Sequence, residues 1–209
     1  MKGQTIGVIG GTGSGKSSLV NLIPRLYDAT QGEVLVDGVN VKDYDIETLR
    51  NKVGIVMQKA VLFKGTIREN MWMGKKGATD EQIDEALEIS QSKEFVDSKQ
   101  GRLDYVIEQG GKNLSGGQRQ RLTIARAIVR KPDVLILDDS ASALDFATDA
   151  ALRKAIRGMN NSPTVFIVSQ RAASLMYADL IIVLDDGQVA GMGTHDELSL
   201  IHISEPTRP

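Results

Sequence analysis

The stretch TIGVIGGTGSGKS, residues 5–17, places a short apolar run directly before a glycine-rich loop that ends in lysine and serine. Residues 5–9 predict a buried strand, and we expect a helix over about 17–26 that Pro24 kinks or ends. Between them, Gly10 to Ser17 matches the pattern G-x-x-x-x-G-K-[ST], which requires a strand before it and a helix after it. A chance glycine-rich turn is the alternative, and the correct neighbours on both sides argue against it.

The glycines of this loop let successive backbone N–H groups converge on phosphate oxygens at the positive end of the following helix. We expect Lys16 to reach the β- and γ-phosphates of ATP and the Ser17 hydroxyl to ligate Mg²⁺. The predicted nucleotide-binding residues are Gly10, Gly11, Thr12, Gly13, Ser14, Gly15, Lys16, Ser17 and Ser18. The loop therefore predicts a site for ATP and Mg²⁺.

A second apolar run, Val134 to Leu137, ends in Asp138-Asp139. In a parallel sheet, an acid at the carboxyl end of a buried strand meets the phosphate-binding loop, where it can hold the shell of a Mg²⁺ ion. A solvated aspartate at a strand end is the ordinary alternative for Asp138. The phosphate-binding loop in the same chain favours the metal role.

Strands and helices alternate along most of the chain, which predicts an α/β fold, a P-loop NTPase with a mostly parallel sheet and flanking helices. The helix-rich stretch at about 60–130 interrupts this alternation and predicts an inserted helical subdomain. Asp37-Gly38 predicts a hairpin. Helices are expected at 46–52, 66–71, 79–91, 115–130, 148–159 and 172–177, further strands at 53–57, 164–168, 180–184 and 188–192, and irregular chain at 101–111.

The composition excludes several classes of function. The net charge is −2 and the pI about 5.8, so no basic surface is expected to attract nucleic acid. The chain has no cysteine, which excludes disulfides and thiolate metal sites. No apolar run approaches the roughly 20 residues of a membrane span, and the first residues do not have the pattern of a signal peptide.

LSGGQ lies where the longest predicted helix begins, at Leu114, Ser115, Gly116, Gly117 and Gln118. A capping serine and two glycines at a helix start form a second anion-binding site, although an ordinary N-cap is the simpler reading of Ser115 alone. With the following RQRLTIARAI, these residues match the signature of ATP-binding-cassette (ABC) ATPases without a mismatch. The chain resembles an ABC ATPase domain over residues 1 to about 198.

The resemblance assigns further residues. Gln58 matches the Q-loop glutamine, which implies contact with Mg²⁺ or the attacking water and a link to a transporter partner, whereas a surface glutamine is the alternative. The implied metal residues are Ser17, Gln58 and Asp138, and the implied D-loop is Ser142, Ala143, Leu144 and Asp145. Residues 62–70 resemble the segment after the Q-loop in exporter-type cassettes, and residues 108–111 resemble the short loop before the signature that faces the transmembrane domains in exporters.

In this family two cassettes enclose two ATP molecules head to tail. The resemblance therefore implies that Ser115 and Gly117 complete the site of a partner, a second ABC ATPase domain, while this chain's own phosphate loop holds the other nucleotide. It also implies transmembrane domains of an exporter as partners and a location at the cytoplasmic face of the cell membrane.

Two positions depart from the family pattern. The catalytic glutamate after Asp138 is replaced by Asp139, whose carboxylate is drawn back by about 1.5 Å. A misplacement of about 1 Å can cost on the order of 100-fold in rate. The usual histidine after the next strand is Gln170, which can donate a hydrogen bond but carries no charge. Together, the catalytic candidates Asp139, Gln170 and Gln58 resemble the degenerate half of a heterodimeric multidrug exporter, with weak ATP hydrolysis in isolation.

Two other functions compete with an ATP-hydrolysing exporter domain. One is a non-hydrolytic regulatory nucleotide-binding subunit of a heterodimeric transporter, which Asp139 and Gln170 favour. The other is a soluble ABC protein that acts on DNA or ribosomes. The exporter-like stretch Phe63 to Asn70 and the absence of a basic patch argue against the second.

The two ends also differ from the family pattern. The strands that carry an adenine-stacking aromatic residue are not found before the phosphate loop, so nucleotide affinity is expected to be reduced, since such stacking contributes about 1–3 kcal/mol. Residues 199–209, SLIHISEPTRP, do not match the family and are expected to form a disordered, non-native-looking tail. No ligand spacing supports His195 or His202 as a metal or catalytic residue, so we expect surface roles for both.

Overall fold

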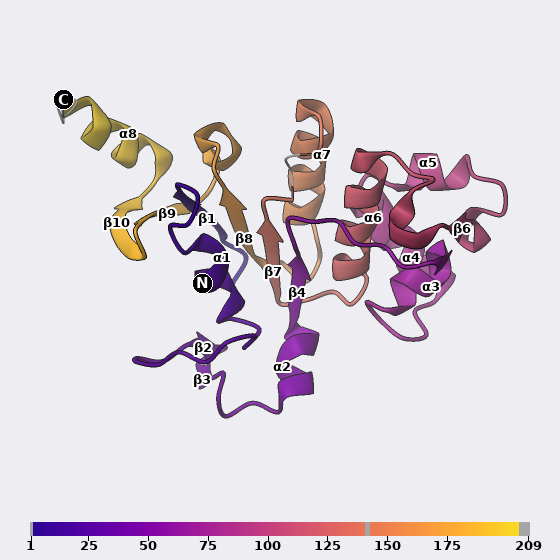
Figure 1. Ribbon diagram of the computed structural model, residues 1–209, viewed down its shortest axis with the longest axis horizontal. Coiled ribbons are helices and arrows are strands. Elements are labelled where there is room, and N and C mark those ends of the chain that lie inside the picture. The colour runs from indigo at the N-terminus through magenta and orange to yellow at the C-terminus, as the bar shows by residue number, and fades with distance from the viewer. Residues whose placement is uncertain (1, 141–142, 205–209) are drawn as a thin grey trace.

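A six-stranded sheet, ordered β10-β9-β1-β8-β7-β4, organises the computed structural model, which describes residues 2–140 and 143–204 (Figure 1). Neighbouring strands are parallel except β9 and β10. The bounds are β1 Thr5–Gly10, β4 Val53–Val56, β7 Val134–Asp138, β8 Thr164–Ser169, β9 Leu180–Asp185 and β10 Gln188–Gly193. The predicted α/β class with a mostly parallel sheet is confirmed.

Apolar side chains cover both faces of this sheet, which explains why its strands read as continuous apolar runs. In β7, Leu135 and Leu137 belong to one hydrophobic cluster and Ile136 to the other. The first cluster includes Leu122 of α6 and Leu152 of α7, and the second includes residues of α1 and α2. These helices are α1 Lys16–Asn21, α2 Ile46–Lys52, α6 Gly116–Ile128 and α7 Phe146–Arg157.

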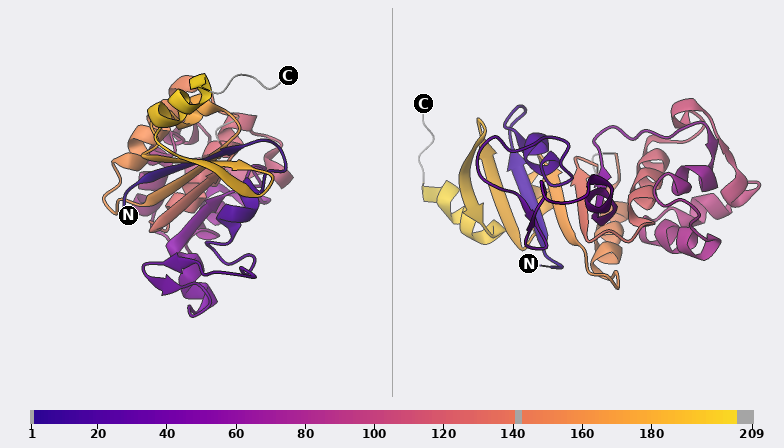
Figure 2. Two further views of the ribbon diagram at one scale, coloured as in Figure 1. Left: turned by 90° about the vertical axis from the view of Figure 1, so that its left-hand side faces the viewer. Right: turned by 90° about the horizontal axis from the view of Figure 1, so that it is seen from below.

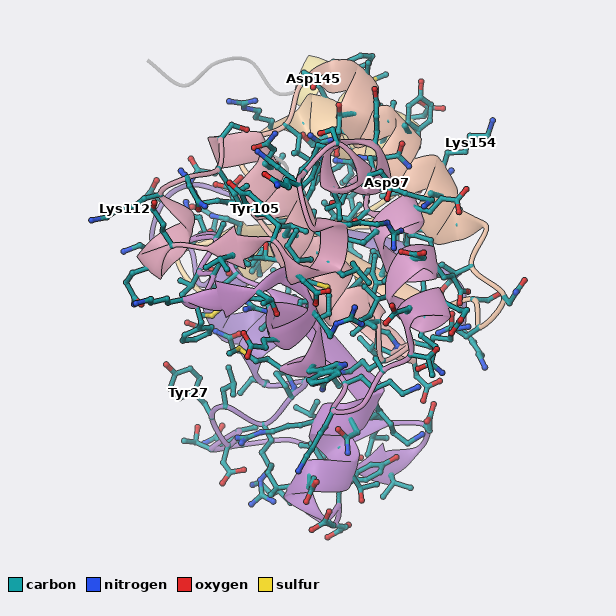
Figure 3. The ribbon with its side chains drawn as sticks, turned by 90° about the vertical axis from the view of Figure 1, so that its right-hand side faces the viewer. Tyr27, Asp97, Tyr105, Lys112, Asp145 and Lys154 are labelled. Carbon is teal, nitrogen blue, oxygen red and sulfur yellow. The ribbon has the colours of Figure 1, made fainter. Side chains whose placement is uncertain are left out.

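The helix-rich stretch lies beyond the β4 end of the sheet, as Figures 1 and 2 show. It contains α3 Ile67–Trp72, α4 Asp80–Ile89, α5 Lys93–Asp97, the short strands β5 Gly65–Thr66 and β6 Val106–Ile107, and the 3-10 turns η1 Arg102–Asp104 and η2 Gln109–Gly111. Figure 3 views the molecule from this side and labels Asp97, Tyr105 and Lys112, which belong to three of its segments. Reciprocal capping boxes begin α3, α4 and α6.

The remaining elements are the hairpin of β2 Leu35–Val36 and β3 Val39–Asn40, the 3-10 turn η3 Ala172–Leu175 and α8 His195–Ser204. The predicted hairpin is confirmed. Near residues 172–177 the chain forms a 3-10 turn where an α-helix was expected. No helix among the described residues combines the length and apolar character needed to cross a bilayer.

Two expectations about helix ends are wrong. Helix α1 ends at Asn21, not near Leu26, because the N–H groups of Leu22 and Ile23 donate to carbonyls three residues back, at 3.2 Å each, and the chain continues as turns to Leu26. At the other end, α8 continues through residue 204, so 199–204 are helical where disorder was expected. A strong start explains this helix, because Thr194 and Glu197 cap one another reciprocally. Residues 205–209 and the side chain of His202 lie outside the described part.

Close packing between the turn after α3 and helix α6 generates a stability prediction. A Cβ on Gly74 would overlap the Arg126 carbonyl oxygen and lie 2.8 Å from Val129 Cγ1. Gly74→Ala is therefore expected to lower the free energy of unfolding by about 1–3 kcal/mol, measured by urea denaturation. Gly158→Ala is the control, because its Cβ would meet nothing closer than 3.5 Å. Equal stability of the two variants would contradict the packing described.

Candidate functional site

The glycine-rich loop joins β1 to α1 and leaves an open concave backbone. Gly13 and Gly15 have φ values of 83° and 92°, a left-handed conformation that glycine adopts without strain. No atom lies within 4 Å of a Cβ built on Gly11 or Gly13, so space remains above the loop. Gly10 is different, because a Cβ there would overlap the Leu184 carbonyl oxygen and lie 2.5 Å from Ser14 Oγ.

The ammonium group of Lys16 is held by the loop itself. Its Nζ donates to the carbonyl oxygens of Gly10 at 2.9 Å and Gly11 at 2.6 Å, and to Ser14 Oγ at 3.4 Å. The side chain is buried, whereas Thr12, Ser17 and Ser18 are exposed. Within the described residues its partners are neutral oxygens, and a buried cation of this kind can exchange loop carbonyls for phosphate oxygens.

The acidic pair lies at the same edge of the sheet. Asp138 ends β7, is 8% exposed and is paired with Val168 of β8. Asp139 follows with a φ of 45°, and its N–H donates to the Val168 carbonyl at 2.9 Å. Gln58, which follows β4, donates from Nε2 to Asp139 Oδ2 at 3.1 Å. Two predicted catalytic residues, 81 positions apart, are thus in direct contact.

Gln170 follows β8 and is exposed. Its neighbour Ser169 pairs with Ile9 of β1, so the end of β8 adjoins the start of the phosphate loop. The turn between β9 and β10 also touches this loop, because the Gly187 N–H donates to the Ser14 carbonyl at 3.3 Å. Asp186-Gly187 is a typical turn pair, but nothing in the sequence indicates its contact with the phosphate loop.

The LSGGQ residues form the start of α6. Ser115 Oγ accepts from the Gln118 N–H at 3.2 Å, and Gln118 Oε1 accepts from the Ser115 N–H at 3.1 Å. Ser115 and Gly116 are exposed, while Leu114 is buried. Figure 1 shows β7 and β4 between α1 and α6, so the two predicted anion-binding sites of this chain lie apart.

The predicted D-loop lies against the start of α6. A Cβ on Gly117 would lie 3.4 Å from the Ala143 carbonyl oxygen and 4.0 Å from Leu144 Cδ2. Asp145 caps α7 by accepting from the Thr148 N–H at 2.9 Å, and this bond lowers the pKa of Asp145. Ser142 lies outside the described residues.

The donor set fits a magnesium ion bound together with a nucleotide. Ser17 offers a hydroxyl, Asp138 a carboxylate, and Gln58 an amide oxygen, since its nitrogen is engaged by Asp139. Mg²⁺ prefers such oxygen ligands and takes only one or two carboxylates when phosphates supply the rest. Among the described residues no group of three or more His, Cys, Asp or Glu side chains could hold a metal alone.

Comparison with known proteins agrees with this geometry. A family model described as ABC transporter matches residues 1–142. A putative multidrug export ATP-binding/permease protein of Staphylococcus aureus (strain NCTC 8325 / PS 47) is 41% identical over 197 residues, 94% of this chain and 34% of the relative. Its counterpart in strain bovine RF122 / ET3-1 is 40% identical over the same lengths.

A solved structure gives the same result. The structure of a bacterial Atm1-family ABC exporter with ATP bound matches with a TM-score of 0.90 and 32% identity, covering 98% of this chain and 36% of that chain. The chain thus spans about a third of the length of these relatives. With the phosphate loop, the acidic strand end and the LSGGQ helix in place, the chain belongs to the ABC transporter family.

Proposed function

We propose that this chain binds Mg-ATP on the loop Gly10–Ser17 and is the ATP-binding and ATP-hydrolysing domain of an ABC exporter. The observation that carries the proposal is the buried Lys16 ammonium, whose partners among the described residues are neutral oxygens of a loop with open space at Gly11 and Gly13. The relatives named as multidrug export ATP-binding/permease proteins support the transport role.

The residues at the sheet edge have separate tasks in this proposal. Lys16 exchanges loop carbonyls for β- and γ-phosphate oxygens, which fixes the phosphate chain. Ser17, Asp138 and Gln58 hold Mg²⁺, which neutralises charge on the phosphates when bound. Asp139 orients the attacking water and accepts its proton, and Gln170 donates a hydrogen bond towards the γ-phosphate.

We further propose that hydrolysis at this site is slow. The Asp139 side chain is one methylene shorter than the glutamate of the family pattern. Its carboxylate also accepts a hydrogen bond from Gln58. Gln170 carries no charge with which to stabilise the transition state. These features also favour the second candidate, a non-hydrolytic regulatory nucleotide-binding subunit of a heterodimeric transporter.

The exposed Ser115 and Gly116 at the start of α6 are proposed to complete a partner's nucleotide site. Their separation from this chain's own phosphate loop is the supporting observation, because each anion site then needs a second chain to face it. The partners are a second ABC ATPase domain, in a heterodimer, and the transmembrane domains of an exporter. The domain would lie at the cytoplasmic face of the membrane.

The same proposal divides the chain into an ABC ATPase domain over residues 1–198 and a tail over 199–209. The helical subdomain is placed at about 60–130. A single hydrophobic cluster joins Ile83 and Leu87 of α4 to Leu135 of β7, which supports treating the helical stretch as part of the ATPase domain.

Replacing Lys16 tests nucleotide binding. Lys16→Met keeps the length of the side chain but removes its charge, and a hydrogen bond to a charged group contributes about 1.5–3 kcal/mol. ATP affinity measured by calorimetry is expected to fall by about 10- to 100-fold. Lys59→Met, at an exposed lysine beside Gln58, is the control and should bind normally. Unchanged affinity of Lys16→Met would exclude the loop as the ATP site.

Restoring the family residues tests the slow site. Asp139→Glu with Gln170→His is expected to raise phosphate release by up to about 100-fold, because the carboxylate regains its reach and a protonatable ring returns. Release is measured with and without a complementary cassette. Asp139→Asn with Gln170→His is the matched control and should stay slow. If the first double variant gains nothing in either condition, the degenerate-site interpretation is wrong.

A further inference from the structure

One side chain of α6 reaches the segment that follows Gln58. Arg126 Nη2 donates to the Val61 carbonyl at 2.9 Å, and its guanidinium carbon lies 5.8 Å from the centre of the Phe63 ring. The same helix begins at Ser115. Arg126 therefore connects the helix of the LSGGQ motif to the glutamine loop, which we define as residues 58–63.

The guanidinium of Arg126 lies in an unusual environment for a cation. Burial lowers its pKa, and no carboxylate pairs with it within the described residues. Its Nη1 atom is buried and has no hydrogen-bond partner there. Burying a charge without full pairing costs free energy, so packing alone does not explain an arginine at this position.

The far end of the glutamine loop is fixed to α6. Asn70, fully buried, accepts from the Phe63 N–H and donates to the Phe63 carbonyl, each at 3.0 Å. Gly74, four positions later, packs so closely that a Cβ would overlap the Arg126 carbonyl oxygen. Residues 63–74 are thus held against the helix, and residues 58–61 connect them to the nucleotide site.

The near end of this loop lies at the nucleotide site. Gln58 Nε2 donates to Asp139 Oδ2 at 3.1 Å, so hydrogen bonds at the two ends of residues 58–61 join the acidic strand end to Arg126. A displacement of Gln58 on metal binding would reach the Val61 carbonyl through three peptide units, about 11 Å of chain at most.

We propose that Arg126 is a positioning residue that transmits the Mg-ATP-dependent movement of Gln58 to the Ser115 turn of α6. Nη1 of Arg126, which has no partner among the described residues, offers the glutamine loop a second hydrogen-bond donor. Arg126 therefore keeps its contact with the loop when the loop moves, and α6 moves with it. This inference rests on the proposed nucleotide site at Gly10–Ser17. It adds a residue that touches neither nucleotide nor metal.

Hydrogen exchange tests the proposal directly. In the unsubstituted chain, saturating Mg-ATP is expected to slow amide exchange at residues 10–18, in the glutamine loop and in the first turns of α6, residues 115–122. Arg126→Met keeps most of the side-chain volume and removes every donor. It should retain the response at 10–18 and in the loop, and lose the response at 115–122.

Arg121 provides a matched control on the same helix. Its Nη1 donates to the Gln91 carbonyl, its guanidinium lies 5.0 Å from the Phe95 ring, and burial lowers its pKa. Its contacts lead to α4 and α5, away from the glutamine loop. Arg121→Met should therefore loosen the helix as much as Arg126→Met and still keep the nucleotide response at 115–122.

Arg126→Lys is a milder variant that keeps the charge and one donor. It should restore at least part of the ATP-dependent slowing of exchange at 115–122. It also replaces Arg126→Met in the experiment if that variant fails to fold. The proposal is overturned if Arg126→Met keeps the full response, if Arg121→Met loses it equally, or if the unsubstituted chain shows none. Absence of protection at residues 10–18 would instead contradict the nucleotide site, and with it this inference.

Discussion

The backbone hydrogen bonds that align β1, β8 and β7 in parallel determine where the phosphate loop, the acidic pair and Gln170 lie. Ile9 is paired with Ser169, and Asp138 with Val168, so three strands end at one edge of the sheet. The phosphate loop, the acidic pair and Gln170 each follow one of these ends. A shift of register by one residue would turn the strands' side chains to opposite faces and separate these groups. The chemistry of the site thus depends on backbone pairing, in which the functional side chains take no part.

The features that could be predicted from sequence are those with a local physical cause. The strand, loop and helix around Lys16 follow from adjacent residues, and Ser115 marks a helix start because its side chain satisfies a free N–H three positions later. Apolar runs predicted the sheet because both of its faces are covered. Helix α5 and the pair β5–β6 could not be predicted, because they are too short for periodicity to show. Contacts such as Gln58 with Asp139 could not be predicted either, because nothing in the neighbourhood of either residue encodes the other.

Charge is arranged in two different ways at the two predicted anion sites. In the phosphate loop a side-chain cation is present and is shielded by carbonyl oxygens. At the start of α6 there is no acidic residue in the first turn, and the positive end of the helix itself faces outward beside Ser115. The phosphate loop can bind an anion through the charge of Lys16, whereas the start of α6 attracts one through its backbone dipole. Two such sites suit opposite sides of one polyphosphate. This complementarity supports the proposed pairing with a second chain, because one chain cannot bring its own two sites together.

The left-handed backbone at Asp139 has a consequence for which residues this position tolerates. For most L-residues such a conformation costs about 1–2 kcal/mol, whereas aspartate and asparagine adopt it more readily than others. A glutamate at this position would have to offset that conformational cost by faster hydrolysis of the nucleotide. Where the bound nucleotide serves mainly to hold two chains together, faster hydrolysis brings no advantage. The conformational preference of the backbone alone would then keep the shorter side chain. Backbone geometry, and not only loss of catalytic demand, can therefore maintain the aspartate.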